Sequence, residues 1–157
     1  ELAKRVGHNG KIYIDREFHK FSLDSKKMCQ DLIKLGCIER KSLILEFPTK
    51  EQVPKELLSH FIRGFFDGDG SIYFRGKNKD AKSVSFVSTR KFLMKLKEIL
   101  LEESIDSSDF LIRYKNKIDS AGEIRFGDKK GVRRFYEYVY KDCENLFLKR
   151  KKEKFIC

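Results

Sequence analysis

The sequence predicts an α+β fold in which helices and β-hairpins alternate along the chain. Some segments carry apolar residues at helical spacing, others alternate polar and apolar residues, and residues suited to helix capping stand at their borders. With 40% hydrophobic and 13% aromatic residues, the 157-residue chain also has enough apolar side chains for a core. We therefore expect a packed domain rather than a disordered chain.

The first group of predicted elements lies before Pro48. Its order is helix end, hairpin and helix, at residues 1–7, 11–15 with 19–23, and 26–35. Gly7 ends the first helix, Ser25 is suited to cap the second, and Gly36 ends it. We assign residues 1–41 to this group and residues 42–53 to a connector.

The second group covers residues 54–157. Pro54 can open a helix because its missing N–H is harmless there, and Thr89 and Asp128 are suited to cap two more. The predicted order is helix, strands at 71–75 and 83–88, helix, strands at 110–115 and 123–126, helix, and a basic helix at 146–154.

The two groups are related by an internal repeat. A shift of 103 residues aligns Ser25 with Asp128 and carries the strand, cap and helix pattern of 1–41 onto the end of the second group. Residues 1–41 are therefore interpreted as the back half of a unit that is complete at 54–157. The same shift places the partner of Asp69 at 69 − 103 = −34. Because the chain also begins at Glu1 without Met, we expect it to be part of a longer protein.

The net charge of +11 suits a polyanionic partner, and nucleic acid is the usual one. No stretch approaches the roughly 20 apolar residues of a membrane helix, and no signal peptide is present, so we expect an intracellular protein that is neither secreted nor membrane-bound. The cysteines and histidines lack zinc-site spacing and are read as reduced thiols and ordinary side chains.

Two carboxylates, Asp67 and Asp69, stand where the helix opened by Pro54 is predicted to end. A helix C-terminus already carries about half a negative charge, so acids there suggest a bound cation. Mg²⁺ takes carboxylate oxygens together with water and phosphate, and Mn²⁺ or Ca²⁺ are possible substitutes. A solvated, glycine-rich helix end is the plain alternative. A calcium loop starting at Asp67 fits poorly, because Ile72 and Asn78 occupy the positions that need Gly and Glu.

Gly64 and Gly68 lie four residues apart and therefore share one face of this helix. Each costs about 1 kcal/mol relative to Ala in a helix interior, which a close contact between two backbones would offset. Two such helices would bring two acidic ends together, which is the geometry of two-metal phosphodiester cleavage.

Residues 62–70, Ile-Arg-Gly-Phe-Phe-Asp-Gly-Asp-Gly, resemble the LAGLIDADG motif of homing endonucleases. The order of elements and the segments 53–58 and 40–43 also resemble two-repeat, single-chain members. The resemblance implies an αββαββα repeat whose twisted antiparallel sheet enters the DNA major groove. It implies that Asp69, with Gly68, holds the metal, and that Asp67 is structural. Only one motif is present, whereas the family cuts with two.

A second motif helix must therefore come from residues upstream or from a homodimer partner. We expect the contact to involve Phe61, Gly64, Phe65 and Gly68. Lys151 and its repeat partner Lys41 are candidates for stabilising the cleaved phosphate, with plain backbone contact as the alternative. Strand alternation predicts a DNA-facing surface. Its members are Ser71, Tyr73, Arg75, Lys77, Ser83, Ser85, Arg113, Lys115, Arg125, Lys11, Tyr13 and Lys20.

The leading functional hypothesis is a site-specific, Mg²⁺-dependent endonuclease that cuts double-stranded DNA. One alternative is a regulator or splicing factor of the same family that binds DNA or RNA without cutting. A third is the endonuclease domain of an intein.

Overall fold

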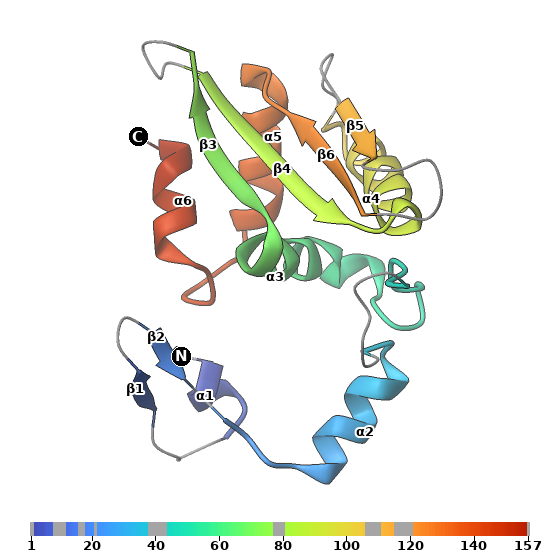
Figure 1. Ribbon diagram of the computed structural model, residues 1–157, viewed down its shortest axis with the longest axis vertical. Coiled ribbons are helices and arrows are strands. Elements are labelled where there is room, and N and C mark those ends of the chain that lie inside the picture. Colours follow the sequence, from blue (N-terminus) through green and yellow to red (C-terminus); the bar gives the residue numbers. More distant parts are fainter. Residues whose placement is uncertain are drawn as a thin grey trace.

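The computed structural model describes residues 2–7, 12–15, 18–20, 22–37, 44–76, 81–105, 111–114 and 121–156. Figure 1 shows a four-stranded sheet with helices behind it, and a smaller group of N-terminal elements set apart below. The second group of elements follows the predicted order. It comprises η2 (Lys55–Leu57), α3 (Leu58–Asp69), β3 (Ser71–Arg75), β4 (Ala81–Ser88), α4 (Arg90–Glu102), β5 (Leu111–Tyr114), β6 (Gly122–Phe126), α5 (Lys129–Tyr140) and α6 (Lys149–Ile156).

The sheet has the order β3-β4-β6-β5, and every neighbouring pair is antiparallel. Helices α4 and α5 pack against one face, and α6 lies beside β3 (Figure 1). The core lies between this face and the helices, and five phenylalanines are fully buried in it: Phe66, Phe86, Phe92, Phe126 and Phe135. The predicted α+β fold class is confirmed.

Side-chain caps set the helix starts as the sequence predicts. The side chains of Ser25, Thr89 and Asp128 accept hydrogen bonds from backbone N–H groups three residues further on, at 3.2, 3.2 and 2.8 Å. Helix α6 begins at Lys149 rather than near 146, because the backbone around Leu148 is held by α3, as described below.

The N-terminal elements are α1 (Leu2–Arg5), β1 (Tyr13–Asp15), β2 (Phe18–Lys20) and α2 (Lys26–Lys34), in the predicted order. The capping residues Ser25 and Asp128 are 128 − 25 = 103 residues apart, which agrees with the register of the repeat. No residue of α2 is buried. The boundaries at 41 and 53 remain predictions.

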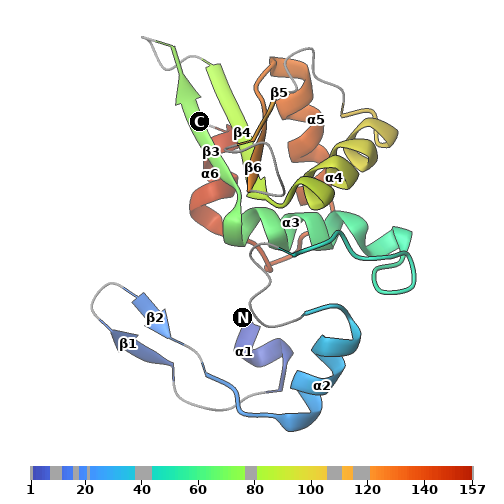
Figure 2. The same cartoon turned by 45° about the vertical axis from the view of Figure 1, so that its right-hand side comes forward.

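Figure 2 shows the N-terminal elements below α3 and the sheet above it, so that α3 runs along the lower edge of the larger group. Among the described residues, no helix is long and apolar enough to cross a membrane.

Candidate functional site

Helix α3 places the acidic motif, and its inner face is anchored in the core. Ile62 and Phe66 are buried, and Phe65 packs on Phe92 with ring centroids 4.4 Å apart. Phe61 packs on Phe47 at 5.3 Å. The rings of Phe61 and Phe65 thus pack on this chain and are half-buried, and their contact with a partner helix stays a prediction.

The outer face of α3 carries Gly64 and Gly68, which are both exposed, and Leu57 at the end of the preceding η2 is exposed as well. A Cβ atom added at Gly64 or Gly68 would meet no other atom of the described chain within 4 Å. Packing among the described residues therefore does not require glycine at either position.

The turn from α3 into β3 needs glycine at a third position. A Cβ atom at Gly70 would lie 2.8 Å from the carbonyl oxygen of Phe66 and 2.4 Å from its ring. Gly70 also donates its N–H to that carbonyl at 2.9 Å. Because only glycine fits there, the chain can leave the helix directly after Asp69.

A buried lysine closes the C-terminal end of α3. Lys151 is 4% exposed, and its Nζ donates to the carbonyl oxygens of Phe66 at 2.6 Å, Asp67 at 2.9 Å and Gly70 at 2.5 Å. Burial, with Arg150 nearby, lowers the pKa of this ammonium. The prediction that Lys151 faces a phosphate does not match this arrangement, because all three of its N–H donors are used on α3. The positive charge expected at this helix end is thus supplied in part by the Lys151 ammonium.

Asp67 uses its carboxylate to fasten the helix to the C-terminal elements. Its Oδ1 accepts from the Tyr140 hydroxyl at 3.2 Å, and its Oδ2 accepts from the backbone N–H of Leu148 at 2.8 Å. Burial and the Asp67 charge raise the pKa of Tyr140. Asp67 is therefore structural, in agreement with the expectation from its position in the motif.

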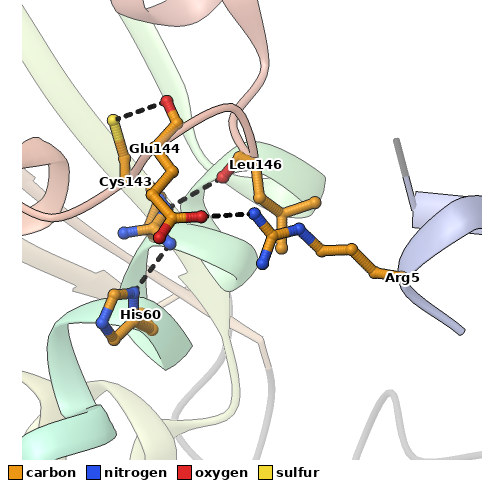
Figure 3. A network of polar contacts seen from close by, with 6 residues as sticks. Arg5, His60, Cys143, Glu144 and Leu146 are labelled. Atoms are coloured by element: carbon orange, nitrogen blue, oxygen red, sulfur yellow. Dashed lines mark hydrogen bonds and ion pairs between the residues drawn. The ribbon is translucent and has the colours of Figure 1, made fainter.

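Arg63 makes a further attachment that the sequence did not reveal. It is buried, and its guanidinium donates to the carbonyl oxygens of Val139 at 2.9 Å and Leu146 at 3.1 Å. Its Nη2 lies 2.8 Å from His60 Nδ1. Figure 3 shows His60 and Leu146 in this network, with Glu144 of the same turn paired to Arg5 of α1. Arg63 and Asp67 thus hold α3 to α5 and to the segment after it, and Lys151 holds the end of α3 to α6.

Asp69 differs from Asp67 because its side chain is exposed. It lines a hollow of about 410 Å³ whose walls are Gly68, Asp69, Gly70, Ser71, Ile72, Arg150, Lys151 and Lys154. Arg150 and Lys154 are two cationic residues that sequence reasoning did not single out. One exposed carboxylate thus stands in a hollow with three cationic residues.

The donor set at Asp69 fits a divalent cation only in part. Mg²⁺ needs one or two carboxylates together with water and phosphate oxygens, and Asp69 supplies one. Lys151 binds carbonyls on both sides of Gly68 but not that of Gly68 itself. Among the described residues, no group of three or more His, Cys, Asp or Glu side chains could hold a metal. The fit is complete only if a second carboxylate or a phosphate comes from another molecule or segment.

The sheet face opposite α4 and α5 carries polar and cationic side chains, as predicted. Arg113 is exposed, and the Arg125 guanidinium lies 5.4 Å from the Tyr73 ring centroid. Arg125 also pairs with Glu123 at 2.9 Å, which raises the pKa of Arg125. The Tyr73 hydroxyl and Arg125 Nε are buried and have no hydrogen-bond partner among the described residues. Polar atoms in this state are uncommon in folded proteins and can mark a binding surface.

Two serines on the central strand do not have the predicted exposure. Ser83 is 0% and Ser85 5% exposed, and the Ser83 hydroxyl donates to the Phe126 carbonyl at 3.1 Å. Ser83 pairs across the sheet with Tyr73 of β3, and Ser85 pairs with Arg125 of β6, so each small side chain lies beside a larger one. Ser83 and Ser85 were expected to be exposed on the DNA-facing side of the sheet, but both are buried beside these neighbours, and their contact with DNA stays a prediction.

Of the other residues predicted to face DNA, some have described side chains and some do not. Ser71 and Tyr13 are exposed, and Arg75 is half-buried. The structure includes the backbone of Lys20 but not the placement of its side chain, and four other predicted lysines lie outside the described residues: Lys11, Lys41, Lys77 and Lys115.

The fold and the site together define an α+β domain of helix, hairpin, helix, hairpin and helix. Its first helix ends in an exposed acid, and its uncovered sheet face is rich in polar and cationic groups. A family profile described as LAGLIDADG-like domain matches residues 56–140, which is more than half of the chain. The chain belongs to this family.

Solved structures with a similar fold include the homing endonuclease I-TnaI, at 16% identity and a TM-score of 0.42, covering 62% of this chain and 66% of that one. Another is the homing endonuclease I-CvuI in complex with the I-CreI target in the presence of Mg, at 16% identity and a TM-score of 0.45, covering 64% of this chain and 62% of that one. The matches span less than two-thirds of either relative. No match was found among curated protein sequences.

Proposed function

We propose that this chain forms one half of a metal-dependent endonuclease that cuts both strands of a specific DNA site. The observation that carries the proposal is the contrast between two neighbouring acids. The carboxylate of Asp67 is held by Tyr140 and Leu148, whereas that of Asp69 is exposed in a hollow beside Arg150 and Lys154. An acid kept free next to cations is suited to a site where metal and phosphate meet.

In this proposal Asp69, with the carbonyl of Gly68, would hold the metal, and Mg²⁺ is the ion that we expect. When bound, such an ion lowers the pKa of a coordinated water and offsets charge on the phosphate. Arg150 and Lys154 would orient the phosphate by charge from the opposite wall of the hollow. Lys151 would position Asp69 rather than contact the phosphate, because its ammonium fixes the helix end that carries Asp69.

The second half of the site would come from another helix of the same kind, in a preceding repeat or in a second copy of the chain. The exposed glycines support this part of the proposal. Gly64 and Gly68 cost helix stability, and a Cβ atom at either would meet no described atom within 4 Å, so a close helix partner would account for them. Two Asp69-type carboxylates would then meet near the junction.

DNA would lie on the open sheet face. Ser71 and Arg113 are exposed there, and Tyr73 and Arg125 are half-buried between the neighbouring strands. Arginine and hydroxyl groups can read base edges in the major groove, while surrounding lysines and arginines contact phosphates.

The second candidate is a protein that binds DNA or RNA without cutting it. The polar sheet face favours binding on its own and does not require Asp69. A nicking assay separates the two candidates. Supercoiled plasmid is incubated with the protein in Mg²⁺ and, in parallel, in EDTA, and we expect nicked and linear products with Mg²⁺ alone. Tight DNA binding with no product under either condition would favour the binding protein and contradict the endonuclease.

A further inference from the structure

A second pocket lies away from Asp69 and away from the open sheet face. It has a volume of about 570 Å³ and is lined by Ala81, Lys82, Gly127, Lys129, Val132, Arg133, Tyr136 and Phe155. These residues come from the start of β4, from the turn between β6 and α5, from α5 and from the end of α6. Helix α5 contacts both β4 and α6, so the pocket lies where these three elements meet. The volume is within the range typical of small-ligand sites.

The floor of this pocket is apolar and partly aromatic. Tyr136 and Phe155 lie with ring centroids 5.5 Å apart, both half-buried, and Val132 lies beside them. Such a surface can stack a flat, unsaturated ring, and stacking of a nucleic-acid base on an aromatic side chain contributes about 1–3 kcal/mol.

The rim of the pocket is cationic. Lys82, Lys129 and Arg133 line it, and no acidic residue does. The basic surface continues along α5, where Lys129, Lys130, Arg133 and Arg134 surround a shallower hollow with a single acid, Glu137. Lys129 and Lys130 are exposed and make no ion pair with any residue that the structure describes. Arg133 pairs with Glu137 at 2.9 Å, and both side chains are exposed.

These features favour one class of ligand. Cations repeated along the first two turns of α5 suit a chain of repeated negative charges, and the aromatic pocket suits a base that is free to leave its stack. Paired bases in a duplex are not free in this way. A membrane surface is disfavoured, because α5 presents no exposed large apolar side chain to insert into lipid.

We propose that the α5 pocket and the adjoining basic surface bind a single-stranded segment of nucleic acid. One base lies in the pocket against Tyr136 and Phe155, and the flanking phosphates contact Lys129 and Arg133. This site is separate from the proposed duplex-binding face, so one molecule holds a duplex and a single strand at the same time. The inference does not depend on cleavage or on Asp69.

Fluorescence anisotropy with a labelled single-stranded oligonucleotide tests the phosphate contacts. The double variant Lys129→Glu with Arg133→Glu should weaken binding on the order of tenfold. The control, Lys50→Glu with Lys55→Glu, makes the same change of net charge at exposed lysines outside α5 and should have a much smaller effect. Both variants should bind a duplex alike. Equal losses in the two variants would overturn the proposal, because charge alone would then explain binding.

A fluorescent base tests the pocket directly. A strand that contains 2-aminopurine should change its fluorescence on binding the unmodified protein, since the base becomes stacked. Tyr136→Leu keeps an apolar side chain but removes the ring, and it should abolish that change while circular dichroism shows an intact fold. An unaltered fluorescence response in Tyr136→Leu would refute stacking in the pocket. Binding of AMP or UMP as tight as that of the strand would refute the strand assignment, because the site would then take free nucleotides.

Discussion

Replacing Lys151 with methionine probes the contact that fixes the end of α3. Methionine has nearly the same length and no charge, so the change removes three hydrogen bonds and leaves the packing of the stem largely intact. The ammonium donates to the carbonyls of Phe66, Asp67 and Gly70, at 2.5 to 2.9 Å, and lies 5.2 Å from the Phe66 ring centroid.

The size of the effect follows from opposing contributions. Hydrogen bonds to a charged group contribute about 1.5–3 kcal/mol each, so three would give roughly 4.5–9 kcal/mol if they were additive. Burial of the ammonium costs several kcal/mol and offsets much of this. The carbonyls left behind at the helix end are partly compensated, since the Phe66 carbonyl keeps the N–H of Gly70. We expect Lys151→Met to lower the free energy of unfolding by about 3 kcal/mol.

Urea unfolding followed by circular dichroism measures this loss. The control is Lys149→Met, which removes an exposed lysine of the same helix whose ion pair with Glu153 spans 3.7 Å. That change should stay within about 0.5 kcal/mol. A loss below about 1 kcal/mol for Lys151→Met would refute the reasoning, since a buried ammonium with three partners should not be dispensable.

Three further predictions concern the same helix and its neighbours. Asp67→Ala should lower the free energy of unfolding by about 1–3 kcal/mol, because the buried Tyr140 hydroxyl and the Leu148 N–H lose their acceptor. An unchanged urea midpoint would contradict the role of Asp67 in fastening the end of α3. Burial and the charge of Glu103 raise the pKa of Tyr138 to about 12, and burial and Asp67 also raise that of Tyr140. The contribution of the protonated phenols to the free energy of unfolding should thus be complete below pH 10 and fall between pH 10 and 12. In unfolding experiments across this range, Tyr140→Phe should show a smaller fall. Gly64→Leu should raise thermal stability by up to about 1 kcal/mol, since a Cβ atom there would meet no atom of the described chain within 4 Å and a helix interior favours Leu over Gly, while light scattering should show weaker self-association. A destabilised Gly64→Leu would show that the outer face of α3 is crowded by this chain.

Local rules of sequence were sufficient to predict most of the fold. Ser25, Thr89 and Asp128 each stand before an apolar stretch at helical spacing, and each caps the helix expected of it. Cap chemistry and helical periodicity are properties of a few adjacent residues, so they can be read without knowledge of tertiary contacts.

Predictions that depended on packing succeeded less often. Lys151 was predicted to face the cleaved phosphate, yet its burial has a signal in the sequence. Phe147, Lys151 and Phe155 lie four residues apart, so the lysine shares the apolar side of this segment. The burial of Ser83 and Ser85 has no such signal, because it comes from large side chains on neighbouring strands.

The attachment of Arg63 was also beyond reach from the sequence. Its guanidinium contacts carbonyls 76 and 83 residues further along the chain, at Val139 and Leu146. Every residue has a backbone carbonyl, so the pattern of side chains in the sequence does not indicate which carbonyls such an arginine will contact.

The most direct test of the proposed function is DNA cleavage by Asp69→Asn. The substitution removes the negative charge at the exposed end of α3 and keeps the side-chain shape, and Asp142→Asn serves as a control at another exposed acid. Plasmid nicking in Mg²⁺ and duplex binding in EDTA are measured for both variants and for the unmodified protein. We predict that Asp69→Asn loses cleavage and retains binding, whereas Asp142→Asn keeps both. Cleavage by Asp69→Asn at the unmodified rate would contradict the assignment of this carboxylate to the metal.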